Sequence, residues 1–117
     1  MTSINSIVKA ALAGCNAPAF FHAWRATAQY PTLPTTYITY QETLFQHEQM
    51  ADDTPYANGR YVRVSVWSDG STAALADQVY DGMTAAGFLL RSATDIYEPD
   101  TQTYHWASDW YLDQPAE

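Results

Sequence analysis

The chain has 117 residues, and its thirteen acidic side chains outnumber its five basic ones, so the formal net charge is -8. This length is enough for one domain with its own core, and the scarcity of Lys and Arg argues against a groove that grips nucleic-acid phosphates. The single cysteine, Cys15, excludes an internal disulfide, and no stretch reaches the roughly 20 apolar residues that span a bilayer. We therefore expect no membrane partner and a reducing cytosol.

The first predicted element is an amphipathic helix over residues 3–13. Apolar residues recur on one face at helical spacing: Ile4, Ile7, Val8, Ala11 and Leu12. Thr2 or Ser3 can cap its start, and Gly14 can end it in the left-handed conformation. The segment 12–15 is similar to the site at which bacterial lipoproteins are lipidated, but the preceding residues lack the basic start and clean apolar core of a signal peptide. We expect a helix end with a buried Cys15 thiol.

Two strands are predicted in the middle of the chain. The segment Phe20–Trp24 is compatible with a short strand or with a loop, and the sequence leaves both open. Tyr37–Phe45 is rich in Tyr, Ile and Thr, which favour strands. A polar segment over 51–59 is expected to form a mobile loop. It leads into a strand over 61–68, where every second residue from Val62 to Val66 is a valine.

A helix and a hairpin are predicted next. Ser68 or Asp69 can cap a helix over Ala73–Ala86, which Gly87 ends, and its apolar residues are spaced by four: Leu75, Val79 and Met83. Residues 88–96 and 104–112 then form the two strands of a hairpin around a Pro-Asp turn. We expect one domain over 1–112 and a flexible tail over 113–117.

These elements predict an α+β fold, with a mainly antiparallel four-stranded sheet and two helices packed on one face. The valines of strand 61–68 would meet the helices, which leaves Arg63, Ser65 and Trp67 on the other face. Arg63 should pair with a carboxylate, either within the sheet or across a subunit boundary.

The aromatic side chains point to an interaction surface. A sheet covered on one face cannot bury both alternating sets of rings, so some should face outward, and outward Trp, Tyr and Arg are enriched where proteins meet proteins. The candidate interface residues are Arg63, Trp67, Tyr97, Trp106 and Trp110.

Enzymatic chemistry has little support in the sequence. The three histidines share no metal-ligand spacing with one another or with Cys15: His22, His47 and His105. Asp52 and Asp53 are more typical of a solvated pair than of a general acid and base. Carboxylates near the hairpin turn can hold calcium, but turn chemistry explains them equally well: Asp95, Glu98 and Asp100. We expect no catalytic residues, no cofactor and no metal.

The order of these parts resembles the tail-completion family of long-tailed bacteriophages and prophages, the tail-terminator or tail-to-head joining proteins. The likeness covers nearly the whole chain. It consists of the N-terminal helix, the Leu33-Pro34 segment running into Tyr37–Tyr40, the strand Tyr61–Ser68, the helix end Ala86-Gly87-Phe88 and the hairpin Asp95–His105.

This resemblance implies a structural virion protein without catalytic residues. The subunit would assemble in the host bacterial cytoplasm into a homo-oligomer, a hexameric ring, that caps the head-proximal end of the tail tube at the head-tail junction. Its partners would be further copies of itself, the tail-tube protein and the head-connector protein. DNA would pass through the lumen without specific binding, which agrees with an acidic surface. The alternative is a small aromatic-lined ligand- or carbohydrate-binding module.

Overall fold

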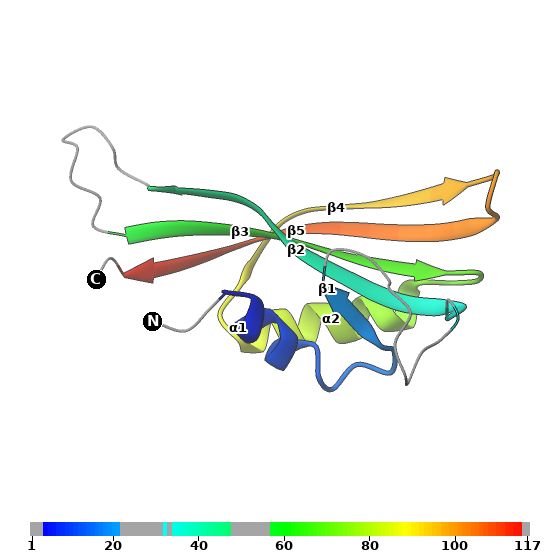
Figure 1. Cartoon of the computed structure of the whole chain (residues 1–117), viewed down its shortest axis with the longest axis horizontal. Coiled ribbons are helices and arrows are strands. Elements are labelled where there is room, and N and C mark those ends of the chain that lie inside the picture. The colour runs from blue at the N-terminus through cyan, green and yellow to red at the C-terminus, as the bar shows by residue number, and fades with distance from the viewer. Residues whose placement is uncertain (1–3, 22–31, 33, 48–56, 116–117) are drawn as a thin grey trace.

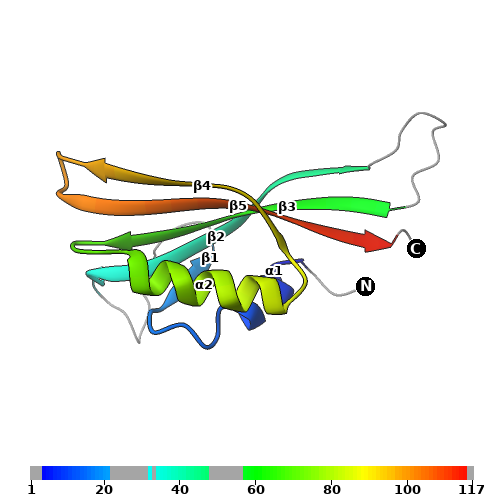
Figure 2. The same ribbon diagram turned by 180° about the vertical axis from the view of Figure 1, so that it is seen from behind.

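The computed structural model describes residues 4–21, 32, 34–47 and 57–115. The elements are α1 (Ile4–Ala11), β1 (Ala19–Phe21), β2 (Thr36–His47), β3 (Ala57–Ser68), α2 (Ala73–Ala85), β4 (Leu89–Glu98) and β5 (Thr103–Pro115). The strands form one sheet in the order β1-β2-β3-β5-β4. Both helices lie on the same side of this sheet (Figure 1, Figure 2).

The predicted α+β class is confirmed, but the predicted four-stranded antiparallel sheet is corrected to a mixed sheet of five strands. The added strand is β1, which pairs in parallel with β2 through Ala19 opposite Ile38. It belongs in part to the segment Phe20–Trp24 that the sequence left open, because three residues are too few to establish an alternating pattern. Trp24 itself lies outside the described residues.

The sheet has two different faces, which we call the covered face and the open face. The covered face packs against the helices and carries Val62, Val64 and Val66 of β3, all at most 1% exposed. The open face carries Arg63, Ser65 and Trp67, which alternate with these valines as predicted. Strand β3 pairs antiparallel with both β2 and β5. A residue of β2 or β5 therefore has its side chain on the same face as the β3 residue opposite it.

The core lies between the covered face and the two helices. Its helical members are Ile4, Val8, Leu75, Val79 and Met83, and its sheet members include Ile38, the three valines of β3 and Trp110. Trp110 is completely buried, and its indole N–H donates a hydrogen bond of 2.7 Å to Ser108 Oγ. The Ser108 hydroxyl donates in turn to the Val64 carbonyl oxygen at 2.7 Å. This relay gives the buried N–H a partner, whose absence would cost about 1–3 kcal/mol.

The helix ends differ from the prediction in two places. Helix α1 ends at Ala11, and Gly14 does not adopt the left-handed conformation. Helix α2 begins at Ala73, as predicted, but its N-cap residue is Thr72 rather than Ser68 or Asp69. Ser68 Oγ instead accepts a hydrogen bond from the Gly70 backbone N–H in the preceding turn. The predicted end of α2 is confirmed, since Gly87 has a φ of 98°, a conformation that glycine adopts without steric cost.

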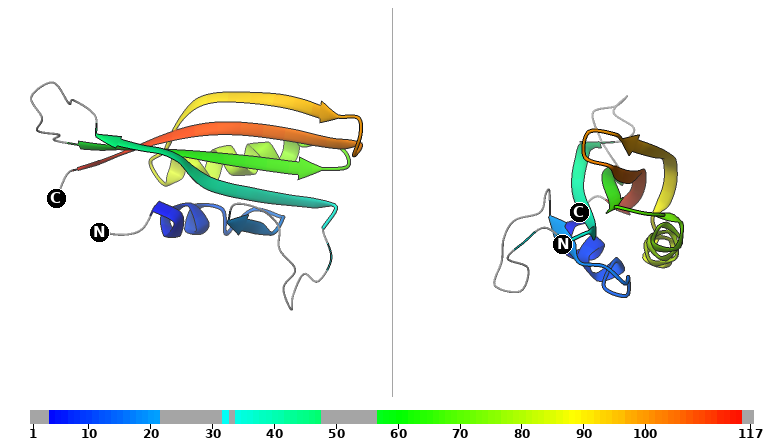
Figure 3. Two further views of the ribbon diagram at one scale, coloured as in Figure 1. Left: turned by 45° about the horizontal axis from the view of Figure 1, so that its top comes forward. Right: turned by 90° about the vertical axis from the view of Figure 1, so that its right-hand side faces the viewer.

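Strands β3 and β5 are longer than predicted. Residues 113–115, which we expected in a flexible tail, pair with 57–59, which we expected in a loop. The rest of that loop, including Asp52 and Asp53, lies outside the described residues. As a result β2, β3 and β5 run on beyond the helices at one end of the molecule (Figure 3).

Strand β4 forms one outer edge of the described sheet. Every residue from Leu89 to Tyr97 is exposed. The register with β5 shifts between Leu90 and Ser92, which marks a β-bulge at Arg91. The other edge is formed by the short strand β1 beside β2.

Replacing Gly82 with alanine should destabilise the fold. A Cβ at this position of α2 would collide with the carbonyl oxygen of Ala11 in α1. In an open helix the same change is worth about 1 kcal/mol of added stability. Here we expect a loss of about 1–3 kcal/mol in the free energy of unfolding, measured by urea titration, because backbone atoms must move apart.

The control is Gly70→Ala, where the added Cβ meets nothing within 4 Å. We expect this variant to stay within about 0.5 kcal/mol of the parent. A Gly82→Ala variant more stable than the parent would contradict the close packing of the two helices.

Candidate interaction surfaces

Three aromatic side chains stack across the open face. Trp67 of β3 lies between Tyr37 of β2 and His105 of β5, directly opposite each in the strand registers. The ring centroids of Trp67 and His105 are 3.8 Å apart with an interplanar angle of 11°, and those of Trp67 and Tyr37 are 6.1 Å apart at 12°. The indole N–H of Trp67 donates a 3.0 Å hydrogen bond to Thr39 Oγ1. We call Tyr37, Trp67 and His105 the aromatic row.

One face of the Trp67 ring is covered by His105 in this row. Its two partners lie on the strands to either side of β3, and both stack nearly parallel to it. A sugar ring needs a free aromatic face to stack on, and His105 leaves Trp67 at most one such face.

His105 is the titratable member of the row. Its Nε2 atom is buried and has no hydrogen-bond partner among the described residues. Burial lowers the pKa of His105 below its usual range, and Arg63 lowers it further, while the charge of Glu98 acts in the opposite direction. Protonation of this ring would place a charge away from water, which is unfavourable.

Arg63 lies on the open face with a carboxylate beside it, as the sequence predicted. Its guanidinium donates two hydrogen bonds to Asp109 of β5, at 2.9 and 3.3 Å, and Ser92 of β4 also donates to this carboxylate. The hydrogen bond from Arg63 lowers the pKa of Asp109 and raises that of Arg63. The two side chains are 49% and 36% exposed, so the pair adds at most about 1 kcal/mol to stability.

The other predicted interface residues lie elsewhere. Trp110 is fully buried in the core, so its ring reaches no surface of the subunit. Trp106 is half-buried and packs against the core, whereas Tyr97 is 49% exposed. All three belong to the covered face. Trp106 and Trp110 lie opposite Val66 and Val62. Tyr97 lies opposite Tyr104, which is two residues from Trp106 in β5 and therefore has its side chain on the same face. Only Arg63 and Trp67 share the open face.

A second surface, the hairpin groove, lies between the start of α2 and the hairpin of β4 and β5. It has a volume of about 750 Å³, and its walls include Tyr97, Tyr104 and Trp106. The Tyr97 and Tyr104 rings are 4.8 Å apart and tilted by 47°. Three carboxylates also line it: Asp69, Asp77 and Asp95. The sequence did not reveal this grouping, because these residues come from a turn, a helix and a strand.

The described residues give little support for a metal site or a reactive thiol. No three His, Cys, Asp or Glu side chains among the described residues gather as metal ligands. Cys15 is a free, half-buried thiol, and burial raises its pKa, which lowers its reactivity. Neither described helix has the length and apolar character needed to cross a membrane.

Comparison with known proteins matches the chain to a protein family and to solved structures. The sequence model of the family described as "Tail completion protein gp17" matches residues 7–110. A chain in the solved structure titled "Virion of native gene transfer agent (GTA) particle" has the same fold, with a TM-score of 0.56, 12% sequence identity, and coverage of 97% of this chain and 87% of that chain. At this identity the likeness is one of fold. No match was found among curated proteins.

The His105 environment predicts a pH dependence of stability. Because the folded pKa lies below the unfolded value of about 6.5, the unfolded chain takes up the proton first. Stability is therefore unaffected well above pH 6.5 and falls as the pH drops through 6.5 toward the folded pKa. Urea unfolding at pH 7.5 and 5.5 should show this loss, and His105→Phe, which keeps a ring against Trp67, should reduce it. An identical loss in both proteins would show that His105 is not its source.

Proposed function

We propose, from the premise that the chain belongs to the tail completion protein gp17 family, that it is a structural subunit of a phage-like tail. The observation that carries this proposal is the family match over residues 7–110, which reaches from α1 into β5. The fold that the chain shares with a protein of a gene transfer agent virion supports a location in the virion. The role is one of assembly rather than catalysis.

In its finer form, the proposal is a hexameric ring that caps the head-proximal end of the tail tube and joins it to the head connector. The subunit would be made in the bacterial cytoplasm and would contact its own copies, the tail-tube protein and the connector protein. The open face supports such contacts, because it presents the aromatic row and an arginine that is half exposed. Aromatic and arginine side chains are the ones most often found at the energetic centres of interfaces.

The charge of the chain supports passage of DNA through the ring. With a net charge of -8, the surface repels phosphates rather than binding them. The arginines Arg60 and Arg63 are also engaged with Glu42 and Asp109 of their own subunit. DNA could then slide through the lumen without strong attachment, since attachment requires free Lys and Arg.

The alternative, a carbohydrate-binding module, would have to use the hairpin groove. Tyr97 and Tyr104 are 49% and 44% exposed there, whereas one face of the Trp67 ring is covered by His105. Glycan-array binding that is lost in Trp106→Ala would favour this alternative over the assembly role.

Assembly tests the proposal directly. We expect the protein to form rings, alone or on addition of tail-tube protein, as seen by native mass spectrometry and negative-stain microscopy. Arg63→Ala should change the free energy of unfolding by less than about 1 kcal/mol, because the ion pair is exposed, yet it should abolish ring formation by removing a side chain from the subunit boundary.

The matched control is Lys9→Ala, which removes the same charge from the exposed side of α1 and should leave rings intact. A protein that stays monomeric in the presence of tail-tube protein would contradict the proposed function. Rings that form normally from Arg63→Ala would instead limit Arg63 to a role within the sheet.

A further inference from the structure

We propose that the hairpin groove binds an extended basic segment, one that carries arginine or lysine side chains, from a different protein of the virion. The inference deepens the proposed function and rests on it for the location of the partner. The chemistry of the groove, however, can be tested on the isolated subunit.

The walls of the groove are aromatic and accessible. The hairpin of β4 and β5 runs past the start of α2, so its covered face is not fully packed by the helix at this end (Figure 2). Tyr97 and Tyr104 are 49% and 44% exposed, while Trp106 is half-buried against the core. Aromatic faces attract Arg and Lys cations that lie within about 6 Å of the ring centre.

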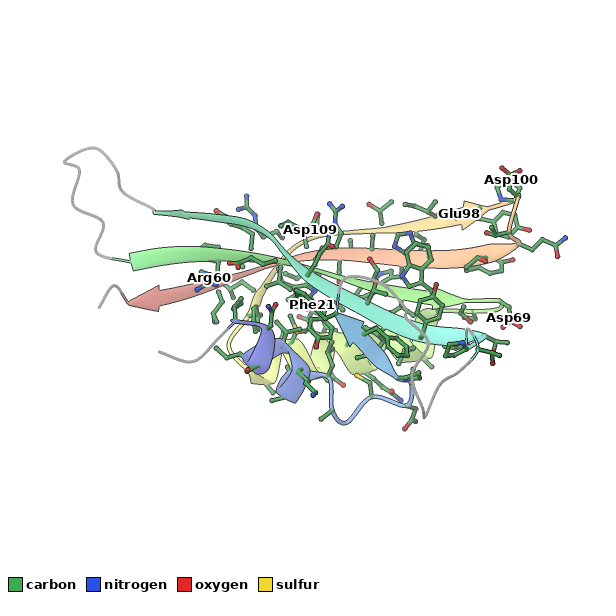
Figure 4. All side chains as sticks on the ribbon, viewed as in Figure 1. Phe21, Arg60, Asp69, Glu98, Asp100 and Asp109 are labelled. Carbon is green, nitrogen blue, oxygen red and sulfur yellow. The ribbon has the colours of Figure 1, made fainter. Side chains whose placement is uncertain are left out.

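The carboxylates of the groove lack a counter-ion within the subunit. Asp69 comes from the turn after β3, Asp77 from α2 and Asp95 from β4, and all three are exposed. In the part of the chain that the structure describes, none of them takes part in an ion pair or a side-chain hydrogen bond. Figure 4 shows Asp69 at the same end of the molecule as Glu98 and Asp100, so the local field is negative.

On the open face, an aspartate and a tyrosine are each paired with an arginine of the same subunit. There Asp109 receives two hydrogen bonds from Arg63, and the Arg91 guanidinium lies 5.0 Å from the centre of the Tyr61 ring. The hairpin groove repeats this combination of aspartate and tyrosine without the arginine. An incoming cationic side chain would supply the missing part.

The occupant is a second protein rather than another copy of this chain. The sequence has only five Lys and Arg residues. Of those described, Arg60 pairs with Glu42, Arg63 with Asp109, and Arg91 lies over Tyr61. The remaining described cation, Lys9, is a single exposed side chain on helix α1 and not part of an extended segment with several cations. A groove of about 750 Å³ with carboxylates on three separate elements has room for more than one cationic side chain, which a basic segment of another protein provides.

The test uses a synthetic peptide, Gly-Arg-Gly-Arg-Gly-Arg-Gly, and the same peptide with citrulline at each arginine. Citrulline keeps the shape of arginine but carries no charge. We expect the arginine peptide to shift ¹⁵N-HSQC signals at the start of α2 and in the hairpin, including the Trp106 indole, with weaker binding in 0.5 M than in 0.05 M NaCl. Equal binding of the citrulline peptide, or shifts confined to the open face, would overturn the proposal.

A double variant and a control test whether the carboxylates of the groove bind the arginine peptide. Asp77→Asn combined with Asp95→Asn should raise the Kd of the arginine peptide about fivefold or more, because two cation-carboxylate contacts are lost. Asp81→Asn is the control, since it removes a charge from the next turn of α2, outside the groove, and should leave the Kd within about twofold. Equal effects of Asp81→Asn and the double variant would show general charge attraction and overturn the groove as the site.

Ring assembly separates this inference from the proposed function. A subunit that forms rings but does not distinguish the two peptides would refute the groove proposal alone. A subunit that binds the arginine peptide in the groove but never assembles would refute the ring and leave the groove standing. Binding of a neutral oligosaccharide at Tyr97 and Tyr104, with no preference for arginine, would count against both and support the carbohydrate module.

Discussion

Helix α2 has 13 residues and so a length of about 20 Å, whereas the 13 residues of β5 extend for about 40 Å. Helix α1, with eight residues, is shorter still. Two such helices can cover only part of one face of the sheet. The core is therefore confined to the region where α1 and α2 meet β2, β3 and β5, and both the open face and the hairpin end must be stabilised in other ways.

The aromatic side chains are placed according to this uneven cover. Where helices are available, Trp110 is buried whole and its N–H is satisfied by Ser108. Where none is available, rings stack on rings, as Trp67 does with its neighbours on both sides. Such pairs stabilise a sheet without a second layer. At the hairpin end neither solution is complete, and Tyr97 and Tyr104 remain about half exposed.

Much of the fold could be predicted from short-range patterns, and the exceptions have physical causes. The valines of β3 and the stripe of α2 repeat often enough to define a face. Strand β1 depends on pairing with β2, which no local pattern of three residues can encode. The aromatic rings of β5 alternate clearly, but only the register, with Trp110 opposite Val62, decides which set is buried. The hairpin groove depends on the approach of a turn, a helix and a strand, and so on the tertiary structure.

The bulge at Arg91 affects how readily the free subunit aggregates before assembly. Strand β4 exposes one long side to solvent within the described sheet, and its side chains include Leu89 and Ile96, which are 65% and 42% exposed. A flat strand of this kind recruits strands from other chains and starts aggregates. By displacing the backbone and placing a positive charge near the start of this edge strand, Arg91 interrupts the flat template. The free protein can thus accumulate at a higher concentration before it precipitates.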